Sequence, residues 1–503
     1  MDVLLAHSFF LKNDAKQVEK MRPYPPLGTL YAASYLRSLG YTVGLFDALL
    51  SDGVHEFEAL LRASDCRMVV LFEDEFHFLN KMCLNHSRQA AQAMASFAAG
   101  RGATVIACGS DVTDHPEAYL LHGVHYAILG EAEHSLGELL GTLRSTGSLC
   151  NAKLDEIPGL ARADSSQPRG VRRNEARIPE RHPDVFPMPA WDLLEAEPYR
   201  AAWMQAHGFF SVNMVSTRGC PFHCNWCAKP IWGQRYAMRS PANVAEEMAL
   251  LKQTIRPDHI WFVDDIFGLQ PKWSVQFAEE VRARDASIPF MIQSRVDLMT
   301  PDAVEALAHA GCREVWIGAE SGSQKILDAM DKGICVEQIP VVRQRLKDAG
   351  IATGFFLQFG YPGETFEDIL ATAEMVRTTL PESIGISVSN PLPGTRFYDM
   401  VKNELGTKDH WDNSDDLAMM FQGSYRTEFY RRLYKVVHRE LDVRLKLQSA
   451  PKNTTEALAE LDSVNAEWKE IQKVEANYQA EHPTSVHKHY LPVLPPNLSG
   501  SWN

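Results

Sequence analysis

Residues 216–230 read STRGCPFHCNWCAKP and carry three cysteines within eight positions. Cys220, Cys224 and Cys227 are spaced C-x3-C-x2-C, directly after an apolar, strand-like run. Thiolates are the ligands that iron–sulfur clusters use, and three of them on one loop can reach a single compact cluster. A structural cluster normally takes four cysteines, so a triad without a nearby fourth leaves one iron open. The stretch therefore predicts a 4Fe-4S cluster with an open iron at the end of a strand.

Two alternatives remain for this triad. A zinc ion could take His223 as a fourth ligand, although a residue between two ligands is awkwardly placed and structural zinc usually binds two separated pairs. The spacing could also be a coincidence. The other six cysteines lie singly, several of them beside strand-like residues, where buried thiols are expected. They are Cys66, Cys83, Cys108, Cys150, Cys312 and Cys335.

The triad lies in a segment, residues 211–391, that alternates strand-like runs with helix-like stretches. Several of the helix-like stretches open with proline near the first turn, a position that proline favours. The predicted strands span 211–217, 259–265, 289–296, 314–321, 352–359 and 383–389. Six βα units predict a partial barrel, in which the chemistry collects at the carboxyl ends of the strands.

The first 145 residues show a similar alternation and predict a doubly wound α/β domain with a five-stranded parallel sheet. We expect its strands at 2–6, 42–48, 67–73, 103–110 and 126–131. Ligands of such sheets bind beyond the carboxyl ends of the strands. Candidate ligand-binding residues in the loops at those ends are Gly109, Ser110, Gly130 and Glu131.

We expect four parts in the chain. They are the doubly wound domain at 1–145, a linker or hairpin at 146–200, the partial barrel at 201–400 and a helical cap at 401–503. The linker segment is rich in Ser, Pro, Arg and Asp, and the last hundred residues read as amphipathic helices followed by a Pro-rich tail.

Composition limits the function further. The 503 residues are 45% hydrophobic and 23% charged, as in ordinary globular proteins. Fifty Lys and Arg against 64 Asp and Glu give a net charge of −14, so nothing attracts the whole chain to nucleic acid or anionic membranes. No cationic stretch precedes the short apolar run at the start, and no run of about 18 apolar residues occurs. We therefore expect a cytoplasmic protein without a membrane span.

Residues 211 to about 400 resemble the radical S-adenosylmethionine (SAM) superfamily, on the strength of the C-x3-C-x2-C motif. The resemblance implies that the open iron chelates the amino and carboxylate groups of SAM. An electron from the cluster, supplied by a donor such as flavodoxin or ferredoxin, then cleaves SAM to a 5′-deoxyadenosyl radical. Trp226, just before the third cysteine, is implied to touch the adenine.

Other strand ends match positions that hold SAM in this superfamily. The resemblance implies that the carboxylates in FVDDIF hold the amino group, that the arginine in QSRVD holds the carboxylate, and that the GAESGSQ residues face the ribose or amino end. It also implies that the glycines of QFGYPGET let the backbone approach the adenine. The residues are Asp264, Asp265, Arg295, Glu320, Ser321, Gly360 and Gly363. A structural ion pair remains the alternative for Asp264 and Arg295.

The first domain resembles the cobalamin-binding domain that precedes many radical SAM enzymes. The matching stretches are RPYPPLGTLYAASYLRSLGY and GSDVTDHPEAYLLHGVHYAILGEAEHSLGELL. The chain lacks the D-x-H-x-x-G motif of cobalamin mutases, whereas many radical enzymes of this subgroup bind cobalamin without a histidine ligand. His7, His77 and the loop 73–78 are candidate neighbours of the lower face of cobalamin.

The whole pattern implies a cobalamin-dependent radical SAM enzyme, foremost a methyltransferase at an unactivated carbon. Methylcobalamin would supply the methyl group, with one SAM spent on each role. The C-terminal region resembles the subgroup of the anaerobic magnesium-protoporphyrin ester cyclase, so cyclisation, rearrangement or carbon–carbon coupling is the alternative. A non-catalytic regulator with a metal clip is a third. The substrate is expected to be a small molecule, of natural-product, lipid or tetrapyrrole type.

Overall fold

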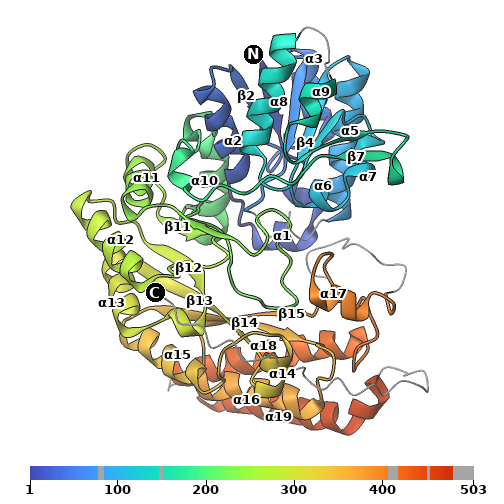
Figure 1. Ribbon diagram of the computed structural model, residues 1–503. Coiled ribbons are helices and arrows are strands. Elements are labelled where there is room, and N and C mark those ends of the chain that lie inside the picture. The colour runs from blue at the N-terminus through green and yellow to red at the C-terminus, as the bar shows by residue number, and fades with distance from the viewer. Residues whose placement is uncertain (77–83, 147–150, 406–416, 450–453, 480–503) are drawn as a thin grey trace, which may run out of the picture.

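The computed structural model describes residues 1–76, 84–146, 151–405, 417–449 and 454–479. Two sheets with their helices lie beside one another, and a helical layer follows the second sheet (Figure 1). The first sheet has the order β2-β1-β3-β4-β5-β6-β7. Its strands are β1 (Val3–Ala6), β2 (Val43–Phe46), β3 (Met68–Phe72), β4 (Thr104–Cys108), β5 (Tyr126–Ile128), β6 (Leu160–Ala163) and β7 (Val171–Arg173).

The strand count differs from the sequence-based prediction. Five strands, β1 to β5, are parallel as expected, but β6 and β7 extend the sheet to seven strands by antiparallel pairing. Both added strands come from the segment predicted as a linker or hairpin. They read LARA and VRR, so they lack the continuous apolar run that marks a strand buried on both faces.

Helices cover both faces of the first sheet because its strands alternate between two cores. On β3, Val69 and Leu71 belong to one core, whereas Val70 and Phe72 belong to the other. The helices of this unit are α1 (Ala15–Lys20), α2 (Leu27–Ser38), α3 (Val54–Arg62), α5 (Asn85–Gly100), α6 (Ser110–Asp114), α7 (Pro116–Leu120), α8 (Glu133–Thr146) and α9 (Asn151–Asp155). Helix α10 (Ala196–His207) leads to the second sheet.

The second sheet consists of six parallel strands in the order β8-β11-β12-β13-β14-β15. They are β8 (Ser211–Met214), β11 (His259–Phe262), β12 (Phe290–Ser294), β13 (Cys312–Glu320), β14 (Ala352–Phe359) and β15 (Ser383–Val388). Each lies within a strand predicted from the sequence or extends it by no more than two residues. Because neighbours in the sheet are neighbours in sequence, this is the predicted half-barrel.

Helices line the outer side of this curved sheet (Figure 1). They are α11 (Pro241–Gln253), α12 (Pro271–Ala283), α13 (Pro301–Ala310), α15 (Gln338–Asp348) and α16 (Phe366–Thr379). Two shorter helices, α14 (Gln324–Ala329) and α17 (Arg396–Val401), share a small core through Ile326 and Phe397. Side chains fix several starts: Ser240 and Thr300 cap α11 and α13 just ahead of a proline. Thr365 and Asp368 form a capping box on α16.

Two long helices, α18 (Thr427–Ser449) and α19 (Thr454–Val474), follow the half-barrel, as the predicted helical cap requires. Glu440 on α18 accepts hydrogen bonds from Arg377 Nε on α16 (2.6 Å) and Trp468 Nε1 on α19 (2.7 Å). This shared carboxylate ties both helices to the outer layer of the half-barrel. None of the helices in the described ranges is long and apolar enough to cross a membrane.

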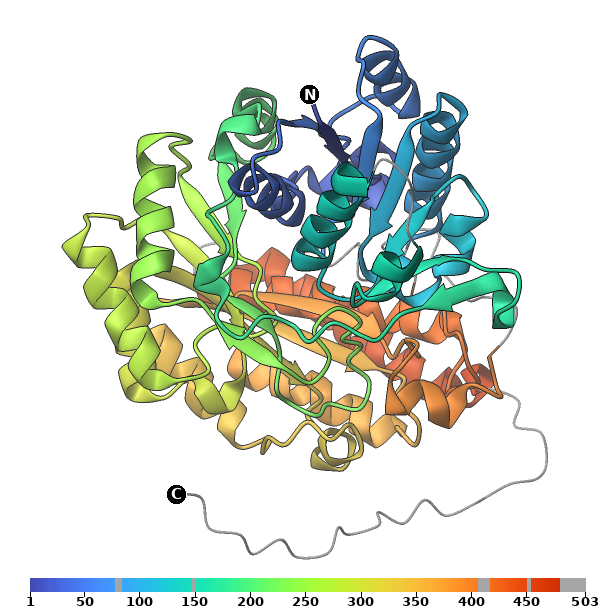
Figure 2. The ribbon, with the colours of Figure 1, turned by 45° about the horizontal axis from the view of Figure 1, so that its top comes forward.

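The first unit stands on one side of the half-barrel in both views (Figures 1 and 2). A loop after α1 reaches the second sheet: Trp203 Nε1 donates to Pro23 O (2.6 Å) and Asn213 Nδ2 donates to Pro25 O (3.0 Å). The Tyr24 ring lies 4.7 Å from that of Trp261 on β11. The two units therefore share a packed boundary near β8 and β11.

Candidate active site

The cysteine loop lies beyond the carboxyl end of β8, in the segment that joins the two short strands of a hairpin. Strand β9 (Thr217–Gly219) pairs antiparallel with β10 (Tyr236–Met238). Gly219 has φ +79°, and a Cβ there would lie 2.4 Å from Arg235 O. Only glycine allows this close approach, so Gly219 determines where strand β9 ends and where the cysteine loop begins at Cys220.

Asp264, at the end of β11, holds the turn from β8 into this hairpin. Its carboxylate accepts from the backbone N and hydroxyl of Ser216 (2.7 and 2.6 Å) and from those of Thr217 (2.7 and 3.0 Å). Burial raises the pKa of Asp264 to about 6, although these hydrogen bonds oppose the shift. Both oxygens of Asp264 are occupied within the protein, whereas its neighbour Asp265 is exposed.

The three cysteines lie on one loop, and each is a partly buried free thiol. Burial raises the pKa of Cys220 and raises that of Cys227 to about 12, and the Asp265 charge adds to both shifts. Lys229 opposes them and also donates to Cys220 O (3.0 Å). The thiols therefore need a strong cationic partner to become thiolates, as cluster irons provide.

The zinc alternative gains no support from the geometry. His223 is exposed. In the parts of the chain that the structure describes, no three His, Cys, Asp or Glu side chains are grouped so that they could hold a metal ion. Thiolates of a four-iron cluster each bind a different iron, so they need not converge on one point as zinc ligands do.

Arg295, after β12, reaches the cysteine loop. Its guanidinium donates to Asp297 Oδ1 (2.9 Å) and Lys332 O (2.9 Å), and Nη1 lies 3.9 Å from Cys224 Sγ. The Phe222 ring lies 3.7 Å from its central carbon. Arg295 is 4% exposed and is thus fixed beside the triad, with Nη1 on the cysteine side.

Glu320 and Ser321, both predicted to contact SAM, bind other side chains and backbone groups of the protein. Glu320, at the end of β13 with φ +55°, forms a buried ion pair with Lys332 Nζ (2.6 Å). Ser321 Oγ accepts from Ser323 N (3.1 Å) and lies 3.1 Å from Thr372 Oγ1. The structure places both at the predicted strand end, and there Ser321 stabilises the turn into α14.

The glycine loop after β14 contains a functional candidate that the sequence reasoning missed. Gly360, with φ +77°, donates its N–H to Glu364 Oε2 (2.6 Å), whereas Gly363, with φ +84°, has open space at its Cβ position. Burial raises the pKa of Glu364 to about 8. The glutamate of the PGET stretch is visible in the sequence, but no sequence pattern shows that Glu364 is buried.

Several buried polar atoms around this end of the half-barrel have no hydrogen-bond partner among the described residues. They are Trp226 Nε1, Gln358 Oε1, Glu364 Oε1 and Ser389 Oγ. Ser389 adjoins the glycine loop through its N–H, which donates to Phe359 O (2.8 Å). Unpaired polar groups of this kind are costly unless a ligand satisfies them, and an adenosine offers matching donors and acceptors.

A second group of unpaired atoms lies at the carboxyl edge of the first sheet. Glu73 Oε1, Glu75 Oε1 and Ser110 Oγ are buried and lack hydrogen-bond partners in the described part of the chain. Gly109, with φ +131°, passes so close to Glu73 that a Cβ would lie 2.6 Å from the Glu73 Cβ. Burial raises the pKa of Glu73, of Glu75 and of the Cys108 thiol.

The two histidine candidates for the lower face of cobalamin have different outcomes. His7 is buried and bonded to Asp47 Oδ1 (2.9 Å). The Asp47 carboxylate raises the pKa of His7 against the effect of burial. His77 lies outside the described residues.

Glu131, predicted as a ligand contact, joins the two units through hydrogen bonds. Its carboxylate accepts from Arg218 Nη1 on β9 (2.7 Å), Trp232 Nε1 (3.2 Å) and Glu180 N (2.7 Å). Glu133, at the start of α8, accepts from Arg218 Nη2 (2.6 Å). Arg218 stands two residues before Cys220, so this buried network links the first sheet to the cysteine loop. No sequence pattern assigned a role to Arg218 or paired it with Glu133, because a pairing between distant segments leaves no local pattern.

Gly130 lies beside this network with φ +77°, and its N–H donates to Thr113 Oγ1 (3.0 Å).

A family model described as the radical SAM superfamily matches residues 214–376, which run from the end of β8 into α16. These residues form a radical SAM domain. The match contains the three cysteines, Arg295, Glu320 and the glycine loop.

Curated relatives of this radical SAM protein include an uncharacterized methyltransferase of Pyrococcus horikoshii. It is 28% identical over 394 residues, which cover 77% of this chain and 81% of the relative. The anaerobic magnesium-protoporphyrin IX monomethyl ester cyclase of Rubrivivax gelatinosus is 29% identical over 222 residues. That match covers 44% of this chain and 39% of the cyclase.

Two solved structures share the fold over most of the chain. The cobalamin-dependent SAM radical enzyme OxsB, with aqua-cobalamin and SAM bound, has a TM-score of 0.71 and 15% identity, covering 95% of this chain and 73% of OxsB. The radical SAM methyltransferase TsrM from Kitasatospora setae, with cobalamin and a [4Fe-4S] cluster bound, has a TM-score of 0.63 and 21% identity. The TsrM match covers 80% of this chain and 75% of TsrM.

Proposed function

We propose that this radical SAM enzyme is a cobalamin-dependent methyltransferase acting on an unactivated carbon of a small molecule. The observation that carries the proposal is the Arg218 network. It joins the cysteine loop of the half-barrel to the carboxyl edge of a doubly wound sheet, the edge at which such sheets bind ligands. Two ligand-binding edges are thereby brought to one boundary.

The chain's own residues fit the cluster and SAM. Cys220, Cys224 and Cys227 would bind three irons, while Asp265 and Arg295 stand beside them with the charges that suit an amino and a carboxylate group. The unpaired atoms near Trp226 and the glycine loop would receive the adenosine. When bound, the cluster and SAM supply a 5′-deoxyadenosyl radical, and cobalamin supplies the methyl group.

The edge of the first sheet fits cobalamin by its unpaired atoms. Corrins carry many primary amides, which donate and accept hydrogen bonds, and Glu73, Glu75 and Ser110 offer buried oxygens without partners among the described residues. A neutral carboxyl can both donate and accept, and the raised pKa values of Glu73 and Glu75 favour that form. The protein's own part is to position these groups and to exclude water.

Anaerobic reconstitution with cluster, cobalamin and SAM tests this function by mass spectrometry of the nucleoside products. Methyl transfer predicts 5′-deoxyadenosine and S-adenosylhomocysteine in equal amounts, together with a methylated product. Tight cluster binding without any retained cobalamin would contradict the proposal. We also propose a low-potential electron donor, such as flavodoxin or ferredoxin, and a cytoplasmic location.

A second candidate is oxidative cyclisation, rearrangement or carbon–carbon coupling with the same cofactors. The relative from Rubrivivax gelatinosus, a magnesium-protoporphyrin ester cyclase, favours it over a segment of 222 residues. This reaction predicts 5′-deoxyadenosine without S-adenosylhomocysteine. The same nucleoside measurement therefore separates the two candidates. A natural product, lipid or tetrapyrrole would serve as substrate in either case.

A further inference from the structure

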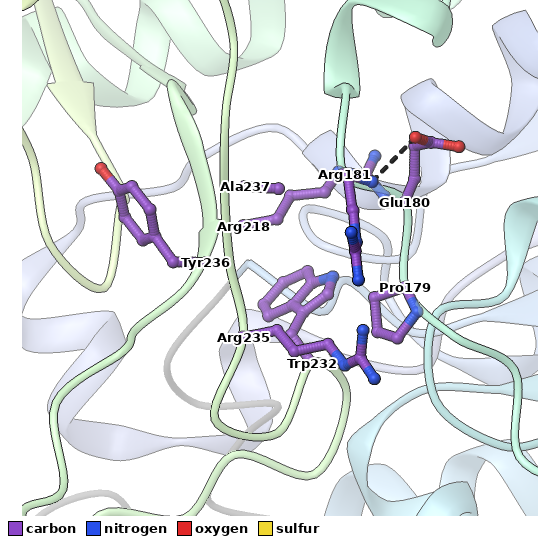
Figure 3. Close-up of a pocket in the computed structure, with 8 residues that line it drawn as sticks. All are labelled: Pro179, Glu180, Arg181, Arg218, Trp232, Arg235, Tyr236 and Ala237. Atoms are coloured by element: carbon purple, nitrogen blue, oxygen red, sulfur yellow. Dashed lines mark hydrogen bonds between the residues drawn. The ribbon is translucent and has the colours of Figure 1, made fainter. Parts of the chain in front are cut away.

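A cavity of about 260 Å³ lies where the first unit, the segment after β7 and the β9–β10 hairpin meet (Figure 3). Eight residues line it: Pro179, Glu180, Arg181, Arg218, Trp232, Arg235, Tyr236 and Ala237. Trp232, from the segment between β9 and β10, contacts the first unit, since its ring stacks on that of Phe76 with 5.4 Å between the ring centroids. The cavity is thus next to the Arg218 network and close to the cysteine loop.

Two of its three arginines have no charged partner among the residues that the structure describes. Arg181 and Arg235 are exposed, and within the described ranges their guanidinium groups make no hydrogen bond or ion pair. Figure 3 shows them reaching from two different segments into the space between Trp232 and Pro179. Arg218 is different, because Glu131 and Glu133 bind it at 2.7 and 2.6 Å.

Glu180, the acidic residue in the lining, does not pair with these arginine side chains. Its Oε1 accepts from the backbone N–H groups of Arg181 and His182 (2.7 and 2.9 Å), and its Oε2 lies 3.5 Å from His134 Nε2. These contacts lower the pKa of Glu180, so its side chain is an ionised carboxylate that binds the backbone of the next two residues. The Arg181 and Arg235 groups stay available to a ligand.

We propose that this cavity binds an anionic group, a phosphate ester or a carboxylate, of a ligand held between the two units. Guanidinium groups form two parallel hydrogen bonds with such oxyanions, and the Trp232 ring, beside Arg181 and Arg235 in Figure 3, offers a flat apolar wall for the atoms that follow. Two sources have this chemistry: the phosphodiester in the nucleotide tail of cobalamin and an acid group of the substrate. The identity of the anionic ligand rests on the proposed function, whereas the anion site itself does not.

The test compares the reconstituted wild-type protein with the double variant R181Q/R235Q. Equilibrium dialysis measures the binding of inorganic pyrophosphate, of cobalamin and of cobinamide, which lacks the nucleotide tail and its phosphate. The control R101Q/R313Q removes the same charge at two exposed arginines away from the cavity. Equal iron content in all variants shows that the fold is kept, and R181K/R235K restores charge without the fork of arginine.

We expect pyrophosphate binding to weaken at least tenfold in R181Q/R235Q and to stay unchanged in the control. If the nucleotide tail is the source, cobalamin affinity falls about tenfold while cobinamide affinity does not. If the substrate is the source, both corrins bind as before and only pyrophosphate binding falls. Unchanged pyrophosphate and cobalamin binding, or an equal loss for both corrins, would overturn the anion site. A wild type that binds no corrin contradicts the proposed function, while pyrophosphate still tests the cavity.

Discussion

Asp264 and Asp265 are adjacent residues with opposite surroundings. Asp264 accepts four hydrogen bonds from Ser216 and Thr217, whereas Asp265 is exposed and acts on the cysteine pKa values. The sequence pattern FVDDIF treats them alike because it records only their position at a strand end. We therefore propose that Asp265 binds the SAM amino group, whereas Asp264 supports the hairpin.

Two substitutions separate these roles. In Asp264→Asn the amide nitrogen cannot accept, which leaves buried donors unpaired and lowers the free energy of unfolding by about 2 kcal/mol. Asp265→Asn keeps the fold and the iron content but raises the KM for SAM at least tenfold. Thermal melting, iron content and SAM-cleavage kinetics measure the three effects. Equal effects of both substitutions on melting temperature would contradict the division.

Glu364 predicts a dependence of stability on pH. Burial raises its pKa in the folded chain to about 8, so the folded state keeps a proton that the unfolded state has already lost. The stability that this proton confers is complete below the ordinary pKa of a glutamate and is lost as the pH rises through about 8. Glu364→Gln cannot ionise, so its melting temperature should fall less than that of the wild type between pH 6 and pH 8. A steeper fall in the variant would contradict this assignment.

At the scale of elements, the β9–β10 hairpin decides where the cysteine loop begins. Gly219→Ala would place a Cβ 2.4 Å from Arg235 O, at a residue whose φ of +79° already disfavours alanine. We expect this variant to lose most of its cluster. Gly233→Ala is the matched control, because its φ of +59° is also left-handed but nothing lies within 4 Å of the new Cβ. Iron and sulfide analysis after reconstitution compares them, and equal retention would count against this role of the hairpin.

The sequence predicted the elements best where hydrophobic pattern alone determines them. Strands such as β1, β3 and β4 are apolar runs whose residues are almost all buried. Strands β6 and β7 are short and contain arginines, and β7 is the edge strand of its sheet. Strand β9 depends on the contacts of Asp264 and Gly219. Such elements are set by tertiary contacts that a local pattern does not contain.

At the scale of the whole molecule, the ion pairs of Arg218 join the two units. Arg218→Met leaves Glu131 and Glu133 buried without their cation and should lower the free energy of unfolding by about 4 kcal/mol. It should also reduce cobalamin retention. Arg396→Met is the control, since the exposed Arg396–Asp331 pair contributes little. Denaturant unfolding measures both, and a similar small loss in each would contradict the structural role of the network.

The order of the units and the cysteine triad followed from sequence, but the contact between the units did not. Glu131 was predicted from its place after β5, and the structure gives its carboxylate to Arg218, Trp232 and Glu180, from segments 49 to 101 residues away. A strand-end position says which edge a residue occupies. It does not say which partner crosses that edge.

The central claim is that the triad holds a cluster that cleaves SAM. The most direct test is 5′-deoxyadenosine formation from SAM after anaerobic reconstitution and reduction, measured together with iron and zinc content. The wild-type protein should contain about four irons and form 5′-deoxyadenosine, and Cys224→Ala should abolish the product. One zinc per chain with no 5′-deoxyadenosine would contradict the account and favour a metal clip without catalysis.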